Sequence, residues 1–166
     1  MIFLNPNQVL DKLELRKDMI AADFGAGSGG FAIPLAKRLE EGLVYALDIQ
    51  REPLSALKSR AQVENVKNIN PIRCDLERPH GSTLPDSHID LVVVANTLFQ
   101  SEDPEALIAE AERVLKKGGQ LLIVDWTEES PQEQNIPLEK VKEITKLELK
   151  EELKIGKFFF SLLFVK

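Results

Sequence analysis

A glycine-rich segment near the N-terminus carries residues whose spacing suits a nucleoside cofactor. Residues 23–29 read Asp-Phe-Gly-Ala-Gly-Ser-Gly and complete an apolar run, 19–24, that has the length of a buried strand. Glycines let the backbone turn sharply and let a ligand approach without meeting a Cβ atom. Residues 25–30 also match the GxGxxG pattern of dinucleotide-binding turns. The glycines therefore predict a nucleoside cofactor and leave its class open.

An acidic residue follows where the ribose of such a cofactor would be held. Asp48 lies in the next apolar run, 43–49, at 23 positions beyond Gly25. A carboxylate there can accept hydrogen bonds from both ribose hydroxyls, in NAD as well as in other nucleoside cofactors. Asp48 thus strengthens the prediction of a cofactor site without deciding between cofactors.

Three more polar positions favour a cationic cofactor over a dinucleotide. Asp23 precedes Gly25 by two residues, where dinucleotide-binding turns usually carry an apolar residue or glycine, and its carboxylate suits a ligand with sulfonium and ammonium groups. Asp75 follows a third apolar run and can accept from an adenine amino group. Asn96 follows a fourth run, where a backbone carbonyl can face an ammonium group.

The elements that must position these residues alternate between strands and helices. Apolar runs predict strands at 19–24, 43–49, 69–74, 89–95 and 121–126, and helical patterns predict helices at 30–40, 52–64 and from the cap Asp103 to Gly118-Gly119. This alternation predicts a parallel sheet covered by helices. Ligands of such sheets bind at the carboxyl ends of the strands, which is where the polar positions recur.

The C-terminal part of the chain predicts a closing hairpin. We expect a short helix at 137–145, a strand of alternating polarity at 147–155, a turn at Gly156-Lys157 and a strand at 158–165 that is apolar on both faces. Two strands joined by so short a turn must be antiparallel.

Composition predicts one soluble domain over residues 1–166. The formal net charge of −6 disfavours nucleic acid and anionic membranes as partners. A single cysteine excludes a disulfide framework and a multi-cysteine zinc site, so no metal site is expected. The N-terminus lacks a signal-peptide pattern, and the longest apolar run, 158–165, is too short to span a bilayer. These features predict a cytoplasmic protein.

On these residues the chain resembles the class I S-adenosylmethionine-dependent methyltransferases, and most of all the group that includes quinone-biosynthesis C-methyltransferases. The likeness is carried by residues 23–29, 48–49, 74–76, 88–98, 113–119 and the final hairpin. It implies an α/β, Rossmann-like doubly wound sheet of seven strands in the order 3-2-1-4-5-7-6, with strand 7 antiparallel. Strand 158–165 would then lie inside the sheet, which would explain its two apolar faces.

The resemblance also implies S-adenosylmethionine as cofactor and assigns residues to its parts. Gly25 and Gly27 would approach the methionine part, Asp48 the ribose hydroxyls and Ile49 the adenine ring. The full set of implied cofactor-binding residues is Asp23, Gly25, Ala26, Gly27, Asp48, Ile49, Cys74, Asp75, Leu76, Asn96 and Thr97. The N-terminal segment, 1–18, would cover the site, with Phe3 and Asn5 as further candidates.

The sequence does not identify a catalytic base. Asp125, Asn96 and His80 are candidates, although His80 is more simply a solvated loop histidine. Trp126 can stack on a substrate or pack as a half-buried aromatic residue. Methyl transfer by in-line displacement depends mainly on alignment of the reactants, so the lack of an obvious base does not argue against an enzyme.

These observations predict a methyltransferase that acts on an unidentified acceptor. Residues 96–99 read Asn-Thr-Leu-Phe in place of the Asn/Asp-Pro-Pro-aromatic pattern of amino-methylating enzymes, which disfavours N-methylation of adenine or glutamine. A small molecule is the favoured acceptor, and a partner protein that presents the substrate remains open. One alternative is a non-catalytic cofactor-binding domain that works through a partner protein; a homo-oligomer is also open. The second alternative, a nicotinamide-dependent oxidoreductase, is disfavoured by Asp23 and by the terminal hairpin.

Overall fold

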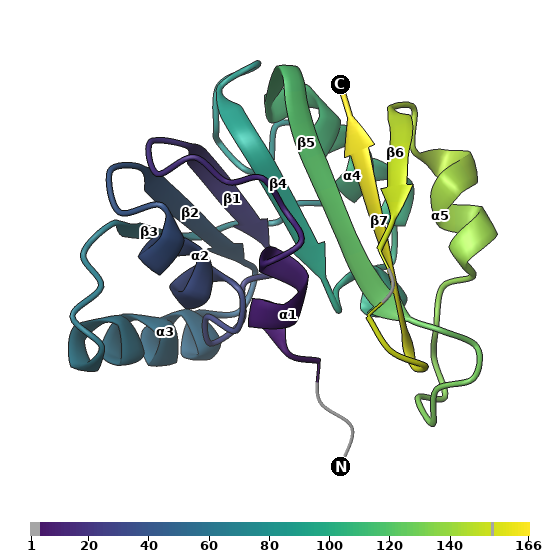
Figure 1. The fold of residues 1–166 in the computed structure, drawn as a ribbon, viewed down its shortest axis with the longest axis horizontal. Coiled ribbons are helices and arrows are strands. Elements are labelled where there is room, and N and C mark those ends of the chain that lie inside the picture. The colour runs from purple at the N-terminus through teal and green to yellow at the C-terminus, as the bar shows by residue number, and fades with distance from the viewer. Residues whose placement is uncertain (1–3, 154) are drawn as a thin grey trace.

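Seven strands form one sheet in the order β3-β2-β1-β4-β5-β7-β6 in the computed structural model, which describes residues 4–153 and 155–166 (Figure 1). The strands are β1 (Ile20–Phe24), β2 (Leu43–Asp48), β3 (Ile69–Arg73), β4 (Ile89–Ala95), β5 (Leu115–Trp126), β6 (Glu148–Glu152) and β7 (Phe159–Val165). Neighbouring strands from β3 to β5 are parallel, whereas β7 is antiparallel to both β5 and β6. The predicted strand order and the antiparallel seventh strand are confirmed.

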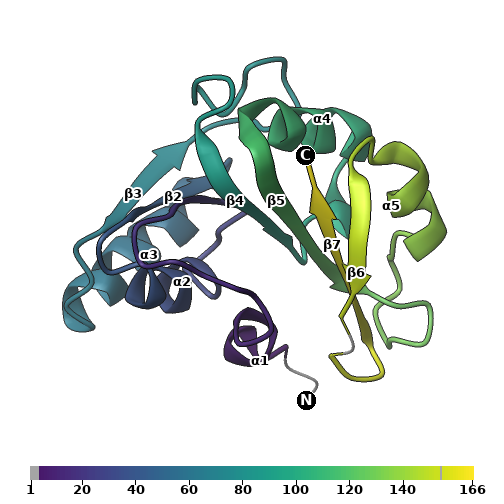
Figure 2. The same ribbon diagram turned by 45° about the horizontal axis from the view of Figure 1, so that its top comes forward.

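Helices cover both faces of this sheet. They are α1 (Pro6–Leu10), α2 (Ala32–Arg38), α3 (Arg51–Val63), α4 (Pro104–Val114) and α5 (Leu138–Ile144), with a short 3-10 helix, η1, at Leu98–Gln100. Apolar side chains of α1, α2 and α3 share one buried cluster with one face of the sheet, and those of α4 and α5 share a second cluster with the other face. Figures 1 and 2 show the resulting three layers.

The position of β7 explains its composition. Phe160, Leu162 and Phe164 belong to the cluster under α4 and α5, while Phe159 and Leu163 belong to the opposite cluster. A strand paired on both sides and covered on both faces is expected to be mostly apolar, and in β7 only the small Ser161 departs from this pattern. Its neighbour β6 lies at the edge of the sheet, where exposed Glu and Lys side chains discourage pairing with another chain (Figure 2).

One predicted boundary is wrong. The helix that begins after Asp103 does not continue to Gly118-Gly119 but ends at Val114, and Leu115 already pairs with Ile89 as the first residue of β5. Gly118 adopts a φ of +78°, and its amide donates a hydrogen bond to the carbonyl of Lys166. The glycines therefore bend the start of a strand rather than terminate a helix.

The N-terminal segment packs against α2. Asn5 caps α1 by accepting from the amide of Asn7 at 3.0 Å, and the Arg38 guanidinium contacts Asn7 and Asp11. Phe3, a candidate for covering the site, lies outside the described residues. No helix in the described ranges is long and apolar enough to cross a lipid bilayer.

Candidate functional site

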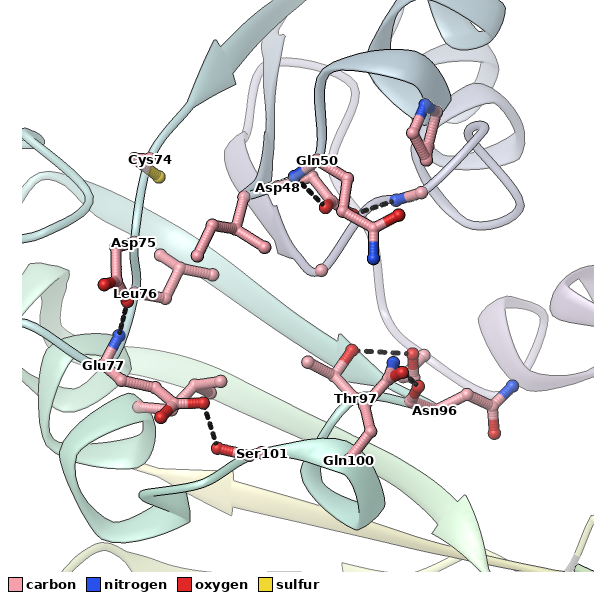
Figure 3. A pocket seen from close by; sticks show the side chains of 16 residues that line it. Asp48, Gln50, Cys74, Asp75, Leu76, Glu77, Asn96, Thr97, Gln100 and Ser101 are labelled. Carbon is pink, nitrogen blue, oxygen red and sulfur yellow. Dashed lines mark hydrogen bonds between the residues drawn. The ribbon is translucent and has the colours of Figure 1, made fainter.

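A cleft of about 510 Å³ lies at the carboxyl ends of β1 to β4 (Figure 3). Nine of the predicted cofactor positions line it: Gly25, Gly27, Asp48, Ile49, Cys74, Asp75, Leu76, Asn96 and Thr97. They come from the segments that follow four different strands, and parallel pairing brings those segments to one edge of the sheet. Residues 4–18, the described part of the N-terminal segment, do not line it.

The glycine-rich turn combines a tight contact with an open space. Gly25 has a φ of +78°, and a Cβ atom at this position would lie 2.3 Å from Oγ1 of Thr97. Gly27 has a φ of +52°, and a Cβ atom there would meet nothing within 4 Å. The lack of a side chain at Gly25 thus lets the Thr97 side chain pack against the turn. The lack of a side chain at Gly27 leaves open space at the cleft.

Asp48 joins the end of β2 to this turn. Its Oδ2 accepts a hydrogen bond from the Gly27 amide at 2.8 Å, and its Oδ1 accepts from the Gln50 amide at 2.9 Å. Two bonds fix the orientation of the carboxylate, and each oxygen keeps a further lone pair for a hydroxyl donor. This arrangement fits a vicinal diol such as that of ribose.

The segment after β3 forms another wall of the cleft. Asp75 Oδ1 accepts from the Glu77 amide at 3.1 Å, and Asp75 Oδ2 accepts from Nε of Arg78 at 2.9 Å. Burial, together with the charges of Asp48, Glu110 and Asp75, raises the pKa of Cys74 to about 12. Cys74 therefore stays a protonated thiol at neutral pH and contributes shape rather than nucleophilicity.

Asn96 holds an unusual backbone conformation beside the glycine-rich turn. Its φ is +52°, and its Oδ1 is buried without a hydrogen-bond partner among the described residues. Its carbonyl oxygen accepts from Nε2 of Gln100 at 3.2 Å. The hydroxyl of Thr97 lies 3.0 Å from the Ala95 carbonyl and 3.2 Å from that of Phe24. A buried acceptor without a partner, next to a cleft, fits a ligand that brings a donor.

Two predicted cofactor contacts do not reach the surface of the cleft. Asp23 is only 2% exposed and Ala26 6%, and neither lines it. Burial raises the pKa of Asp23 to about 7, and the nearby Ala32 amide at the start of α2 offsets this rise only in part. Its Oδ2 has no hydrogen-bond partner in the part of the chain that the structure describes. Its neighbours Ala22 and Phe24 belong to the core cluster shared with α4, so the alternation of side chains along β1 places Asp23 on the opposite face, which α2 covers.

Of the three candidate bases, only Asn96 lines the cleft. Asp125 is fully buried, and its Oδ2 accepts from the amides of Leu98 at 3.0 Å and Phe99 at 3.4 Å. Its Oδ1 accepts from the amide of Trp126, and burial raises the pKa of Asp125 to about 6. The geometry makes Asp125 a cap for η1. His80 is an exposed residue in the connection between β3 and β4.

Trp126 packs within the protein. It is half-buried, and its ring centroid lies 4.3 Å from that of Phe159 at the start of β7. His88, which precedes β4 at the opposite end of the sheet, stands 6.2 Å from the ring of Tyr45. Among residues 4–153 and 155–166 no group of three or more His, Cys, Asp or Glu side chains could hold a metal ion.

Several residues that line the cleft were not predicted from the sequence. They are Gln50, Pro53, Glu77, Ala95, Gln100, Ser101 and Leu107. Most lie within a few positions of a strand end that was identified, so extending each strand-end motif by two residues would have found Gln50 and Glu77. Ser101 and Leu107 carry no such signal, because only the fold of the segment after β4 brings them to the cleft.

The sequence and the fold of this chain are similar to those of known proteins. Residues 22–123 match the family described as "Methyltransferase domain". The chain is 32% identical over 107 residues to the ubiquinone/menaquinone biosynthesis C-methyltransferase of Cupriavidus necator, covering 63% of this chain and 42% of that protein. The equivalent protein of Shewanella piezotolerans is 30% identical over 114 residues, covering 68% and 44%. The chain thus spans less than half the length of these curated relatives.

A solved structure resembles the whole described fold. The crystal structure of a SAM-dependent methyltransferase from Aquifex aeolicus superimposes with a TM-score of 0.82 at 26% identity, covering 97% of this chain and 89% of that one. The likeness extends beyond the residues matched by the family and includes the C-terminal hairpin.

Proposed function

This chain belongs to the class I S-adenosylmethionine-dependent methyltransferases, and we propose that its cleft binds S-adenosylmethionine for transfer of the methyl group to a small-molecule acceptor. The observation that carries the proposal is the Asp48 carboxylate, held by the amides of Gly27 and Gln50 at the edge of the cleft. It presents two oriented acceptors next to the open space at Gly27.

The residues of the cleft fit the parts of this cofactor. Asp48 would accept from the two ribose hydroxyls, and Ile49, whose surface is 57% exposed, would pack on the adenine ring. Asp75 and the Leu76 amide would meet the polar edge of adenine, while Asn96 would face the amino-acid part. When bound, S-adenosylmethionine supplies a methyl group on a positively charged sulfur, which a nucleophile can displace.

The protein's own contribution would be alignment of the reactants. Neither Asp125 nor His80 lines the cleft, so we assign no general base. Orientation of reactants can contribute roughly 7–11 kcal/mol, whereas base catalysis typically adds about 10²–10⁴-fold. Fixed elements around the cleft can therefore support transfer without an ionisable side chain at the reacting atoms.

The class of acceptor is inferred from charge and from relatives. The net charge of −6 repels nucleic acids, and the curated relatives are named as C-methyltransferases of ubiquinone and menaquinone biosynthesis. Both points support a small molecule as the acceptor.

Transfer of a labelled methyl group tests this proposal. The protein would be incubated with methyl-labelled S-adenosylmethionine and a panel of phenols, quinols, amines and thiols. Label should pass to at least one class of acceptor, and Asp48→Ala should reduce the transfer at subsaturating cofactor by roughly 10–100-fold, since hydrogen bonds to a charged group contribute about 1.5–3 kcal/mol. Asp18→Ala, a change at an exposed carboxylate paired with Arg16, serves as control. Cofactor binding without transfer to any member of the panel would instead favour a non-catalytic, partner-dependent domain.

A further inference from the structure

Glu77 joins two walls of the cleft that are distant in the sequence. Its Oε1 accepts from the hydroxyl of Ser101 at 2.6 Å and from the amide of Glu102 at 3.2 Å. Its Oε2 accepts from the amide of Asp103 at 2.9 Å. Both Glu77 and Ser101 line the cleft, and Figure 3 shows the bond between them.

Residues 101–103, the partners of Glu77, lead into the N-terminus of α4, which is held in place. Asp103 caps α4 by accepting from the Ala106 amide at 3.0 Å, and Pro104 occupies the first turn. Leu107 and Ile108 of the same helix are buried in the core. Glu77 is therefore anchored to an element that packing holds in place.

On the β3 side of this connection, Leu76 packs in the core cluster and Ser82 bonds Glu110 of α4, but no regular secondary structure holds the polar groups of residues 75–77. Between β3 and β4 the described chain forms turns and extended segments without a helix or strand. Arg78, which pairs with Asp75, has a side chain that is 79% exposed, so this surface ion pair contributes little. The three hydrogen bonds of Glu77 thus provide the main polar link from residues 75–77 to α4.

We propose that Glu77 is a positioning residue that sets the adenine end of the cofactor cleft. This inference rests on the proposed function, in which Asp75 and the Leu76 amide contact adenine. Since the backbone amide of Glu77 also donates to Asp75 Oδ1, fixing the Glu77 side chain also restrains the Asp75 carboxylate through the Glu77 backbone. A site that is ordered before binding avoids part of the entropy cost of ordering it in the complex.

Glu77→Gln tests the role with little change in size. The amide group replaces one acceptor oxygen with a donor that faces backbone N–H groups, so the link to residues 101–103 weakens. Calorimetry should show the Kd for S-adenosylhomocysteine and for adenosine rising by the same factor, roughly tenfold, because both ligands share the adenosine part. In turnover, KM for S-adenosylmethionine should rise while kcat stays near that of the wild type.

Two further variants make the outcome decisive. Glu105→Gln removes an equal charge in the first turn of α4, where Glu105 pairs with Lys140 at 3.5 Å, and should leave both affinities unchanged. Ser101→Ala removes only the hydroxyl bond and should weaken both ligands by a smaller common factor, which provides a test even if Glu77→Gln folds poorly.

The possible results separate the inference from the proposed function. Affinities of Glu77→Gln within twofold of the wild type, or a loss for S-adenosylhomocysteine that adenosine does not share, would overturn the positioning role. A wild-type protein that binds neither ligand would instead contradict the proposed function.

Discussion

Gly25 and Gly27 share one turn but meet different surroundings, so equal substitutions should have unequal effects. An alanine Cβ at Gly25 would press on Thr97 at 2.3 Å, whereas at Gly27 it would enter open space. A left-handed conformation costs a non-glycine residue about 1–2 kcal/mol in either case. Gly25→Ala should therefore lower the free energy of unfolding well beyond this range, and Gly27→Ala only within it.

Cofactor affinity should respond differently from stability to substitution at these glycines. Gly27→Ala should raise the Kd for S-adenosylhomocysteine at least tenfold because its methyl group would occupy space at the cleft. Urea unfolding and calorimetry on both variants measure the two effects. Wild-type affinity in Gly27→Ala would show that the ligand does not approach this part of the turn.

Asp23 makes stability depend on pH. Burial raises its pKa from 3.8 to about 7, so between these values the folded protein keeps a proton that the unfolded chain releases. The contribution of Asp23 to the free energy of unfolding is therefore highest at low pH. It falls as pH rises through this interval, and it levels off above about pH 7. Asp23→Asn cannot ionise and should gain about 2–4 kcal/mol relative to the wild type between about pH 4.5 and 7.5.

Urea unfolding of both proteins at the two pH values, without cofactor, measures this gain. Asp125, whose pKa is also raised, is common to both proteins and cancels in the comparison. An Asp23→Asn difference that is the same at both pH values would mean that Asp23 is already ionised, or already neutral, throughout the interval.

At the level of single residues, the sequence predicted positions that directly follow a strand. Asp48, Asp75 and Asn96 were found because each ends or follows an apolar run. Glu77 was missed because its role depends on partners 24 to 26 positions away, and nothing in the local pattern indicates those contacts.

η1 and the segment around it depend on one buried carboxylate. Asp125 accepts from the amides of Leu98 and Phe99, which no other bond satisfies in the described structure. Asp125→Ala would leave these donors unpaired and should cost about 1–3 kcal/mol of stability. Amide hydrogen exchange should accelerate at residues 97–100 and stay unchanged in β2 and β3.

A second variant, Asp125→Asn, separates a structural role of this residue from a catalytic one. If Asp125 were a general base, Asp125→Asn would lower kcat by about 10²–10⁴-fold even with exchange at 97–100 unchanged. We expect losses of activity to appear only together with faster exchange in that segment.

Elements with a strong apolar pattern were predictable, and those set by tertiary contacts were not. β4 was predicted at 89–95 and lies at Ile89–Ala95, because a central parallel strand is apolar on both faces. The start of β5 was not, since residues 115–119 have no strand pattern and are extended through pairing with Ile89 and Lys166. α1 is only five residues long, which is too short for a helical repeat of apolar residues to be recognised in the sequence.

For the whole molecule, the fold concentrates the functional positions at one edge of the sheet. The segments at the ends of the parallel strands β1 to β4 form the cleft. The β6–β7 hairpin completes the sheet by pairing with the free edge of β5. The likeness to the Aquifex aeolicus structure spans this entire arrangement. The resemblance recognised in the sequence supplied the strand order, which periodicity alone would not have determined.

The whole fold is expected to select S-adenosylmethionine over a dinucleotide, and calorimetry with S-adenosylhomocysteine and NADH measures this preference. The wild-type protein should bind S-adenosylhomocysteine in the micromolar range and NADH at least about 100-fold more weakly, a difference of roughly 2.7 kcal/mol. Asp48→Ala should weaken S-adenosylhomocysteine by roughly 10–100-fold, because both ribose hydroxyls lose their acceptor. Tighter binding of NADH, or no binding of either ligand, would show that the cleft is not a site for S-adenosylmethionine.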